Sequence, residues 1–207
     1  NPNLTSLTIA GMQTLKFLDC DSCNLSALAL NDLPSLINLR CGSNSLVSID
    51  FSELNSILGI DCTFNQLTSL DFGDITTLKH LDCSANQLSS LNIQNLVNLE
   101  VLRCNSNILQ QLDVTPFQQI TSLDCSSNQL QYLNCSTLHN LQFLFCYENQ
   151  LEYLNIKNGR NEGCDFWGNS TLDYICVDES QRQSTQIKIS TYLQYYGMGQ
   201  CVVGDYC

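Results

Sequence analysis

The sequence predicts a repeat solenoid, in which short coils of chain stack on one another and their strands form a parallel β-sheet. Three observations predict this fold. Cysteines recur every 21 residues, an asparagine follows each cysteine after the first by three positions, and apolar residues alternate with polar ones before the cysteine. A fixed period of about 20–50 residues is typical of stacked repeats, and alternation with a period of two predicts a strand with one buried face.

The repeating unit, aligned on the cysteines, reads L-x-x-L-x-C-x-x-N-x-L-x-x-L-x-φ-x-x-φ-x-x, where φ is apolar. One copy is LKHLDCSANQLSSLNIQNLVN (78–98) and the next is LEVLRCNSNILQQLDVTPFQQ (99–119). The cysteine column is Cys20, Cys41, Cys62, Cys83, Cys104, Cys125 and Cys146. The asparagine column is Asn44, Asn65, Asn86, Asn107, Asn128 and Asn149, with Cys23 in that slot of the first coil. We expect each asparagine to satisfy backbone groups that the turn after the strand leaves unpaired.

This pattern resembles the leucine-rich repeat family, and more narrowly the cysteine-bearing 21-residue repeats of bacterial internalin-type surface proteins. The resemblance covers roughly residues 4 to 178. It implies a curved, right-handed, mostly β coil with a parallel sheet on its concave face and short extended or 3₁₀ segments on its convex face. The repeats begin in mid-unit at Leu4, so we expect a fragment of a longer protein.

The chain divides into residues 1–156, which hold the 21-residue repeats, and residues 157–207, which hold a degenerate last repeat and a C-terminal cap. FWGN (166–169) reads as the last strand, with Phe166 in the cysteine slot and Asn169 in the asparagine slot. A solenoid end needs a cover for its core. The run IKISTYLQYY (187–196) predicts a short amphipathic helix for this role, with inward residues Ile189, Tyr192, Leu193 and Tyr196.

Most of the 13 cysteines are expected to be free core residues, because each ladder cysteine takes the slot of an inward apolar side chain and free cysteine behaves as a small buried hydrophobe. A metal ladder or disulfides along the column remain the alternatives. We expect no metal site and no cofactor. A disulfide between Cys176 and either Cys201 or Cys207 would fasten the cap and would indicate an oxidising compartment.

Composition excludes several function classes. The formal charge of −12, with no basic run, disfavours nucleic acid and anionic membrane surfaces. No apolar stretch approaches the length of a membrane span, so no membrane insertion is expected. The two histidines, His80 and His139, have no evident nucleophile beside them, and an open face excludes water badly. We expect no enzyme and no catalytic residues.

Candidate binding residues lie at the outward positions of the strands. In one column each arginine lies between two aspartates, and the column includes Arg40, Asp61, Asp82 and Arg103. It predicts lateral ion pairing between strands, with a cation site or basic partner at Asp61 and Asp82 as the alternative. The second candidate is an aromatic cluster, Phe143, Phe145, Tyr147 and Trp167, which suits a contact surface unless the cap folds back over it.

The sequence therefore predicts an exported bacterial leucine-rich repeat protein, secreted or on the cell surface, that binds a host or neighbour-cell protein noncovalently through its concave face. A polysaccharide that stacks on the same aromatics is the alternative partner. A third hypothesis makes the repeats a rigid spacer or targeting module of a larger surface protein.

Overall fold

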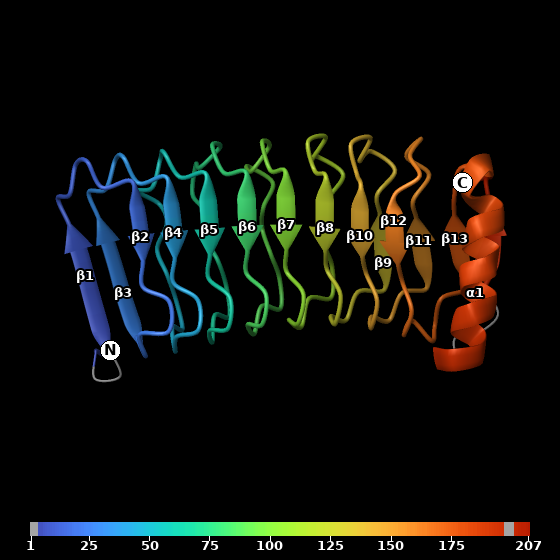
Figure 1. The fold of residues 1–207 in the computed structure, drawn as a ribbon, viewed down its shortest axis with the longest axis horizontal. Coiled ribbons are helices and arrows are strands. Elements are labelled where there is room, and N and C mark those ends of the chain that lie inside the picture. The colour runs from blue at the N-terminus through green and yellow to red at the C-terminus, as the bar shows by residue number, and fades with distance from the viewer. Residues whose placement is uncertain (1–3, 197–200) are drawn as a thin grey trace. The chain divides into compact units, whose positions relative to one another are not determined.

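The computed structural model describes residues 4–196 and 201–207. The chain forms two compact units, residues 1–107 and residues 108–207. Each unit is a stack of coils in which the strand before the ladder cysteine joins one parallel sheet, termed the ladder sheet. The second half of a coil, where it is extended, joins a second parallel sheet (Figure 1).

Unit 1, residues 1–107, has a ladder sheet in which strands that follow one another along the chain are neighbours in space (Figure 1). Its register advances by 21 residues per strand, as in Leu18 opposite Leu39. The ladder strands are β2 (Phe17–Asp19), β4 (Asn38–Arg40), β5 (Gly59–Asp61), β6 (His80–Asp82) and β7 (Val101–Arg103). The second sheet pairs β1 (Ser6–Ala10) with β3 (Ala27–Asn31), and a lone bridge joins Asp50 to Asp71 further along.

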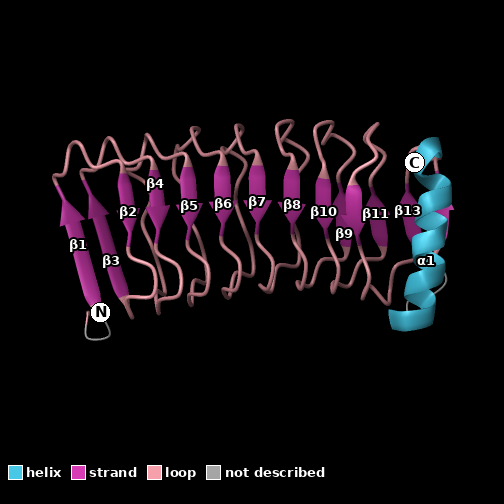
Figure 2. Ribbon diagram, in the orientation of Figure 1, coloured by secondary structure: helices cyan, strands magenta, loops and turns pink. Residues whose placement is uncertain are grey.

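Unit 2, residues 108–207, repeats this plan and adds a cap. Its ladder strands are β8 (Ser122–Asp124), β10 (Phe143–Phe145) and β12 (Gly163–Asp165). Its second sheet holds β9 (Tyr132–Asn134), β11 (Tyr153–Asn155), β13 (Tyr174–Cys176) and β14 (Val202–Gly204), all parallel. The 3₁₀ turn η1 (Glu179–Gln181) leads into the helix α1 (Arg182–Tyr196), which Figure 2 shows in cyan. No helix of the described residues is long and apolar enough to cross a membrane.

The ladder cysteines form part of the core of both units. The side chains of all six from Cys41 to Cys146 are fully buried. They are free thiols, and no group of three potential metal ligands occurs among the described residues. Several thiols point to the carbonyl of the next coil, as in Cys41 Sγ to Asp61 O at 3.4 Å and Cys83 Sγ to Arg103 O at 3.5 Å. The row therefore packs as small apolar side chains that also satisfy a weak donor.

The ladder asparagines connect the backbone of consecutive coils. Asn65 is typical: its Oδ1 accepts the Leu46 N–H at 2.9 Å, and its Nδ2 donates to the carbonyls of Cys41 at 3.0 Å and Cys62 at 3.2 Å. One amide thus satisfies three backbone groups that would otherwise be unpaired in the interior. Asn169 makes the same bonds to Leu151, Cys146 and Phe166 in the degenerate repeat.

The residue two positions after each ladder cysteine adopts a left-handed backbone conformation, with φ between 51° and 56° in seven successive coils. These residues are Ser22, Ser43, Phe64, Ala85, Ser106, Ser127 and Glu148, and Gly168 takes the place in the degenerate repeat with φ 73°. A non-glycine residue disfavours this region. Ser22 shares this conformation although Cys23 follows it. Bonds between the backbones of successive turns, such as the Ser43 N–H to the Thr63 carbonyl at 2.8 Å, therefore help to hold the turn in spite of that cost.

The cap closes unit 2. Thr185 and Ile189 of α1 are buried. Leu193 and Tyr196, which the sequence predicted to face inward, are 38% and 52% exposed. The helix also begins earlier than predicted, at Arg182. Behind it, β14 pairs with β13, and a disulfide joins Cys176 to Cys207, so the structure selects Cys207 over Cys201 as the partner of Cys176.

Candidate functional site

The charged column of unit 1 is an ordered set of ion pairs on the outward face of the ladder sheet. Arg40 lies 2.7 Å from Asp21, 3.3 Å from Asp19 and 3.9 Å from Asp61. Arg103 lies 3.9 Å from Asp82. Each exposed pair of this kind contributes about 0.2–1 kcal/mol. The column therefore organises the face more than it stabilises the fold.

The aspartates of this column have a second, local role. Oδ1 of Asp61 accepts bonds from the Thr63 N–H at 3.1 Å and the Thr63 hydroxyl at 2.8 Å. Asp82 holds Ser84 in the same way, at 3.2 and 2.6 Å. Since Oδ2 of each aspartate lies nearest an arginine, both carboxylates are engaged. This arrangement favours structural pairing over the cation site that the sequence left open.

A shallow hollow of about 410 Å³ lies over this column, between Phe17 and Arg103. Gly59 contributes to it because it has no side chain between Asn38 and His80, its partners in register. Phe17 at the edge is 66% exposed. The hollow is open and mixed in polarity, which fits a contact surface better than a reaction site.

The aromatic cluster of unit 2 lies on β10 and on the turn that follows β12. Phe143 is 51% exposed and lies beside Gly163 in register. Phe145 lies between Asp124 and Asp165, its partners on the neighbouring strands. An exposed ring next to a half-buried ring, with carboxylates on both sides, forms an apolar centre with an acidic rim.

Trp167 belongs to the cap and not to an open surface. Its ring stacks on Tyr147, with centroids 4.7 Å apart, and on Tyr196 of α1, at 4.9 Å. Tyr192 of the same helix meets Phe166 edge-on and donates to Asp165 Oδ1 at 2.8 Å. The cap therefore folds back over part of the predicted cluster, and the exposed part is centred on Phe143.

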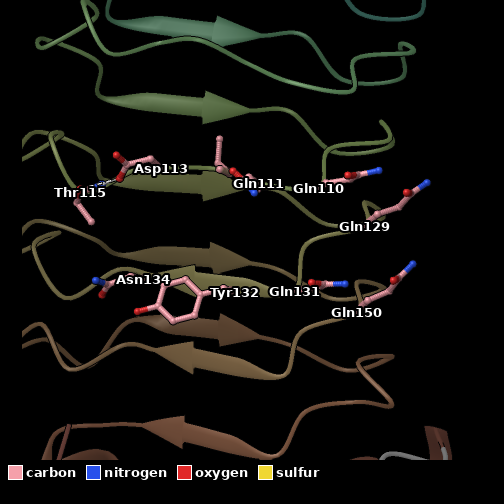
Figure 3. Close-up of a pocket in the computed structure, with 10 residues that line it drawn as sticks. Gln110, Gln111, Asp113, Thr115, Gln129, Gln131, Tyr132, Asn134 and Gln150 are labelled. Carbon is pink, nitrogen blue, oxygen red and sulfur yellow. Dashed lines mark hydrogen bonds between the residues drawn. The ribbon is translucent and has the colours of Figure 1, made fainter.

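The structure also brings together residues that sequence reasoning missed, on the second sheet of unit 2. Tyr132, Tyr153 and Tyr174 stack in one column, with centroids 5.1 and 5.8 Å apart. Beside Tyr132 lies a groove of about 600 Å³ lined mainly by amide side chains (Figure 3). The sequence spacing could have predicted this column, because these tyrosines recur every 21 residues, at the period of the repeat.

Comparison with solved structures decides the family. Internalin J of Listeria monocytogenes, whose functional domain includes a cysteine ladder, is 30% identical over 86% of this chain and 44% of its own, with a TM-score of 0.50. The chain is a leucine-rich repeat protein. Two further leucine-rich repeat structures share the fold: a protein of Leptospira interrogans (19% identity, 79% of this chain, 53% of its own, TM-score 0.55) and YopM of Yersinia enterocolitica (22% identity, 84%, 44%, TM-score 0.50).

This leucine-rich repeat protein spans about half the length of each of these three structures. No protein-family model and no curated protein matches its sequence. The likeness to these repeat structures suggests a protein-binding repeat scaffold.

Proposed function

We propose that this chain is the repeat part of an exported bacterial protein that binds a protein of a host or neighbouring cell noncovalently, as an adhesin does. The binding surface is the outward face of the ladder sheet in unit 2. The observation that carries the proposal is Phe143, a large apolar side chain that is 51% exposed on the middle strand of the three.

The chemistry around Phe143 suits a protein partner. Phe143 and Phe145 offer apolar area on a rigid strand, so ordering them on binding costs little entropy. Asp124 and Asp165 on either side of Phe145 add an acidic rim. A partner with an apolar residue surrounded by lysine or arginine would complement both features, with the charges governing specificity and association rate more than affinity.

A sugar is a weaker candidate on this face. Stacking on a pyranose needs a free ring face, and both faces of Trp167 are occupied by Tyr147 and Tyr196. Trp167, one of the aromatic residues that the sequence offered for sugar stacking, therefore packs against the cap.

Two observations support export. The chain contains a disulfide, and such bonds persist in oxidising compartments. The chain is also 30% identical to internalin J over 86% of its length. Whether the protein is released or displayed, the proposed partner is on the outside of a cell.

Binding of beads coated with the chain to cultured mammalian cells and to unrelated bacteria tests the proposal. Wild-type beads should bind one of these cell types, and protease treatment of the cells should remove the binding. Phe143→Ser should weaken binding at least about tenfold, while Ile187→Ser, at a residue 61% exposed on α1, should not. Binding that survives protease treatment, or equal binding by Phe143→Ser, contradicts the proposal.

A further inference from the structure

The groove on the second sheet of unit 2 has an unusual lining. Of its ten residues, five are glutamines, and the others include Tyr132, Asn134 and Asp113. Figure 3 shows Gln110, Gln129 and Gln150 near one end of the strands, with Tyr132, Asn134 and Asp113 toward the other. The glutamines of the lining are Gln110, Gln111, Gln129, Gln131 and Gln150.

The amides of this groove are available to a ligand. Among the described residues, none of the five glutamine side chains has a hydrogen-bond partner, whereas Asp113 is engaged by Thr115, whose hydroxyl lies 2.6 Å from Asp113 Oδ1. Each free amide offers two donor hydrogens and an acceptor oxygen. A hydroxyl both donates and accepts a hydrogen bond, so the hydroxyls of a polyhydroxylated molecule can bind both the N–H groups and the oxygens of these amides.

Tyr132 supplies a ring face for stacking. Tyr132 is 53% exposed, and one face of its ring packs against the ring of Tyr153 at an interplanar angle of 5°. The position 21 residues earlier holds Gln111, which is not aromatic, so the tyrosine column ends at Tyr132. Because the stack already fixes the ring, a ligand that lies on the other face orders little further.

The amides repeat along the stack of coils. Gln129 and Gln150 are 21 residues apart, as are Gln110 and Gln131, so equivalent amides recur on successive coils, about 5 Å apart. A polysaccharide is itself a chain of equivalent units. A ladder of amides can therefore meet successive sugar units with the same bonds.

The charge of the groove narrows the ligand class. The lining has no lysine or arginine and one aspartate, and the whole chain carries −12, which opposes acidic glycans and nucleic acids. We propose that this groove is a second binding site, specific for a neutral glycan, on a different sheet from the protein-binding face.

Glycan binding by the full chain tests the site. The probes are neutral hexasaccharides of glucose, mannose and xylose in different linkages on an array, followed by calorimetry with any that bind. Tyr132→Ala should weaken binding at least about tenfold, and a Gln111→Ala, Gln131→Ala double variant should weaken it similarly. Tyr195→Ala, at a tyrosine 69% exposed on α1, should bind as wild type does.

The outcomes separate this site from the protein-binding face. Phe143→Ser should keep glycan binding, and Tyr132→Ala should keep cell binding, with circular dichroism showing that each variant is folded. Absence of binding to every neutral glycan, a preference for acidic glycans, or unchanged binding by Tyr132→Ala overturns the inference and leaves the adhesion proposal standing.

Discussion

The indole of Trp167 lies between two tyrosines, and the outer one, Tyr196, stacks on it at 4.9 Å from the end of α1. This contact joins the cap helix to the turn that closes the asparagine ladder. Together with Tyr192 against Phe166, it determines how firmly α1 covers the end of unit 2.

Trp167→Ala should therefore destabilise the cap by about 2–3 kcal/mol, since the substitution removes a half-buried ring together with its two aromatic contacts. Hydrogen exchange of the α1 amides should accelerate, because the helix then opens locally. Tyr195→Ala, on the exposed side of the same helix, is the matched control and should change stability by less than about 0.5 kcal/mol. Unchanged exchange in Trp167→Ala would mean that other contacts hold the helix.

Asn65→Ala should cost about 3 kcal/mol or more in the free energy of unfolding. The change removes the partners of the Leu46 N–H and of the Cys41 and Cys62 carbonyls, and each buried unsatisfied group costs about 1–3 kcal/mol. Denaturant titration measures the loss. Asn55→Ala, at an exposed asparagine outside the ladder, should be close to neutral, and a similar loss there would refute the ladder's special role.

Thiol labelling of the native chain should modify only Cys23 and Cys201, the partly exposed members of eleven free cysteines. Burial raises the pKa of Cys201 to about 11, so its alkylation rate should rise with pH up to that value, because the thiolate is the nucleophile. Unfolding without reductant should expose all eleven thiols. More than two reactive thiols in the native chain would contradict the packed ladder.

Stability should decline with pH through the titration of Glu162. This carboxyl is buried and bonded to Gln181 Nε2 at 3.1 Å, and desolvation raises its pKa above the ordinary 4.5. The folded state therefore holds the proton more tightly than the unfolded state, and the stability from this group is lost as the pH rises from 4.5 through the raised pKa.

Glu162→Gln removes this titration, so the variant should gain stability relative to wild type as the pH rises through that window. Thermal unfolding at a series of pH values measures the difference. Glu179→Gln, at an exposed carboxylate of η1, serves as control and should show no such gain. A constant difference between Glu162→Gln and wild type would show that the pKa of Glu162 is the same in the folded and unfolded states.

Much of the fold could be predicted because every coil packs against its neighbours in the same way and therefore needs the same residue types in the same slots. Cys83 and Asn86 recur in the same slots as their neighbours, and an alignment of the coils predicts the strand, the buried thiol and the amide together. The left-handed residue between them could not be predicted, since serine, alanine, phenylalanine and glutamate all occupy it. Ser22 adopts it although Cys23 follows, so the conformation depends on how the turn stacks on the next coil, as in the Ser22 N–H to Gly42 carbonyl bond at 3.0 Å, and not on the residue's own preference.

The cap and the open aromatic surface were less predictable. The start of α1 is polar, RQSTQ, and lacks the apolar spacing that indicated a helix from Ile187. Placing Tyr196 on Trp167 depends on how the helix lies against the coil, which no local pattern encodes. The groove beside Tyr132 depends on side chains from three coils, and each is unremarkable in its own repeat.

The pairing of β14 with β13 has a consequence for assembly. A stack of parallel strands has no inherent end, because each coil offers the same unpaired backbone groups to the next. Val203 and Gly204 are buried beside β13 and the segment is tied to Cys176 by the disulfide, so the free edge of β13 is occupied by the chain itself. β14 is in turn the outermost strand of this sheet, and α1 packs against it. The strand and the helix together thus hinder end-to-end polymerisation into filaments.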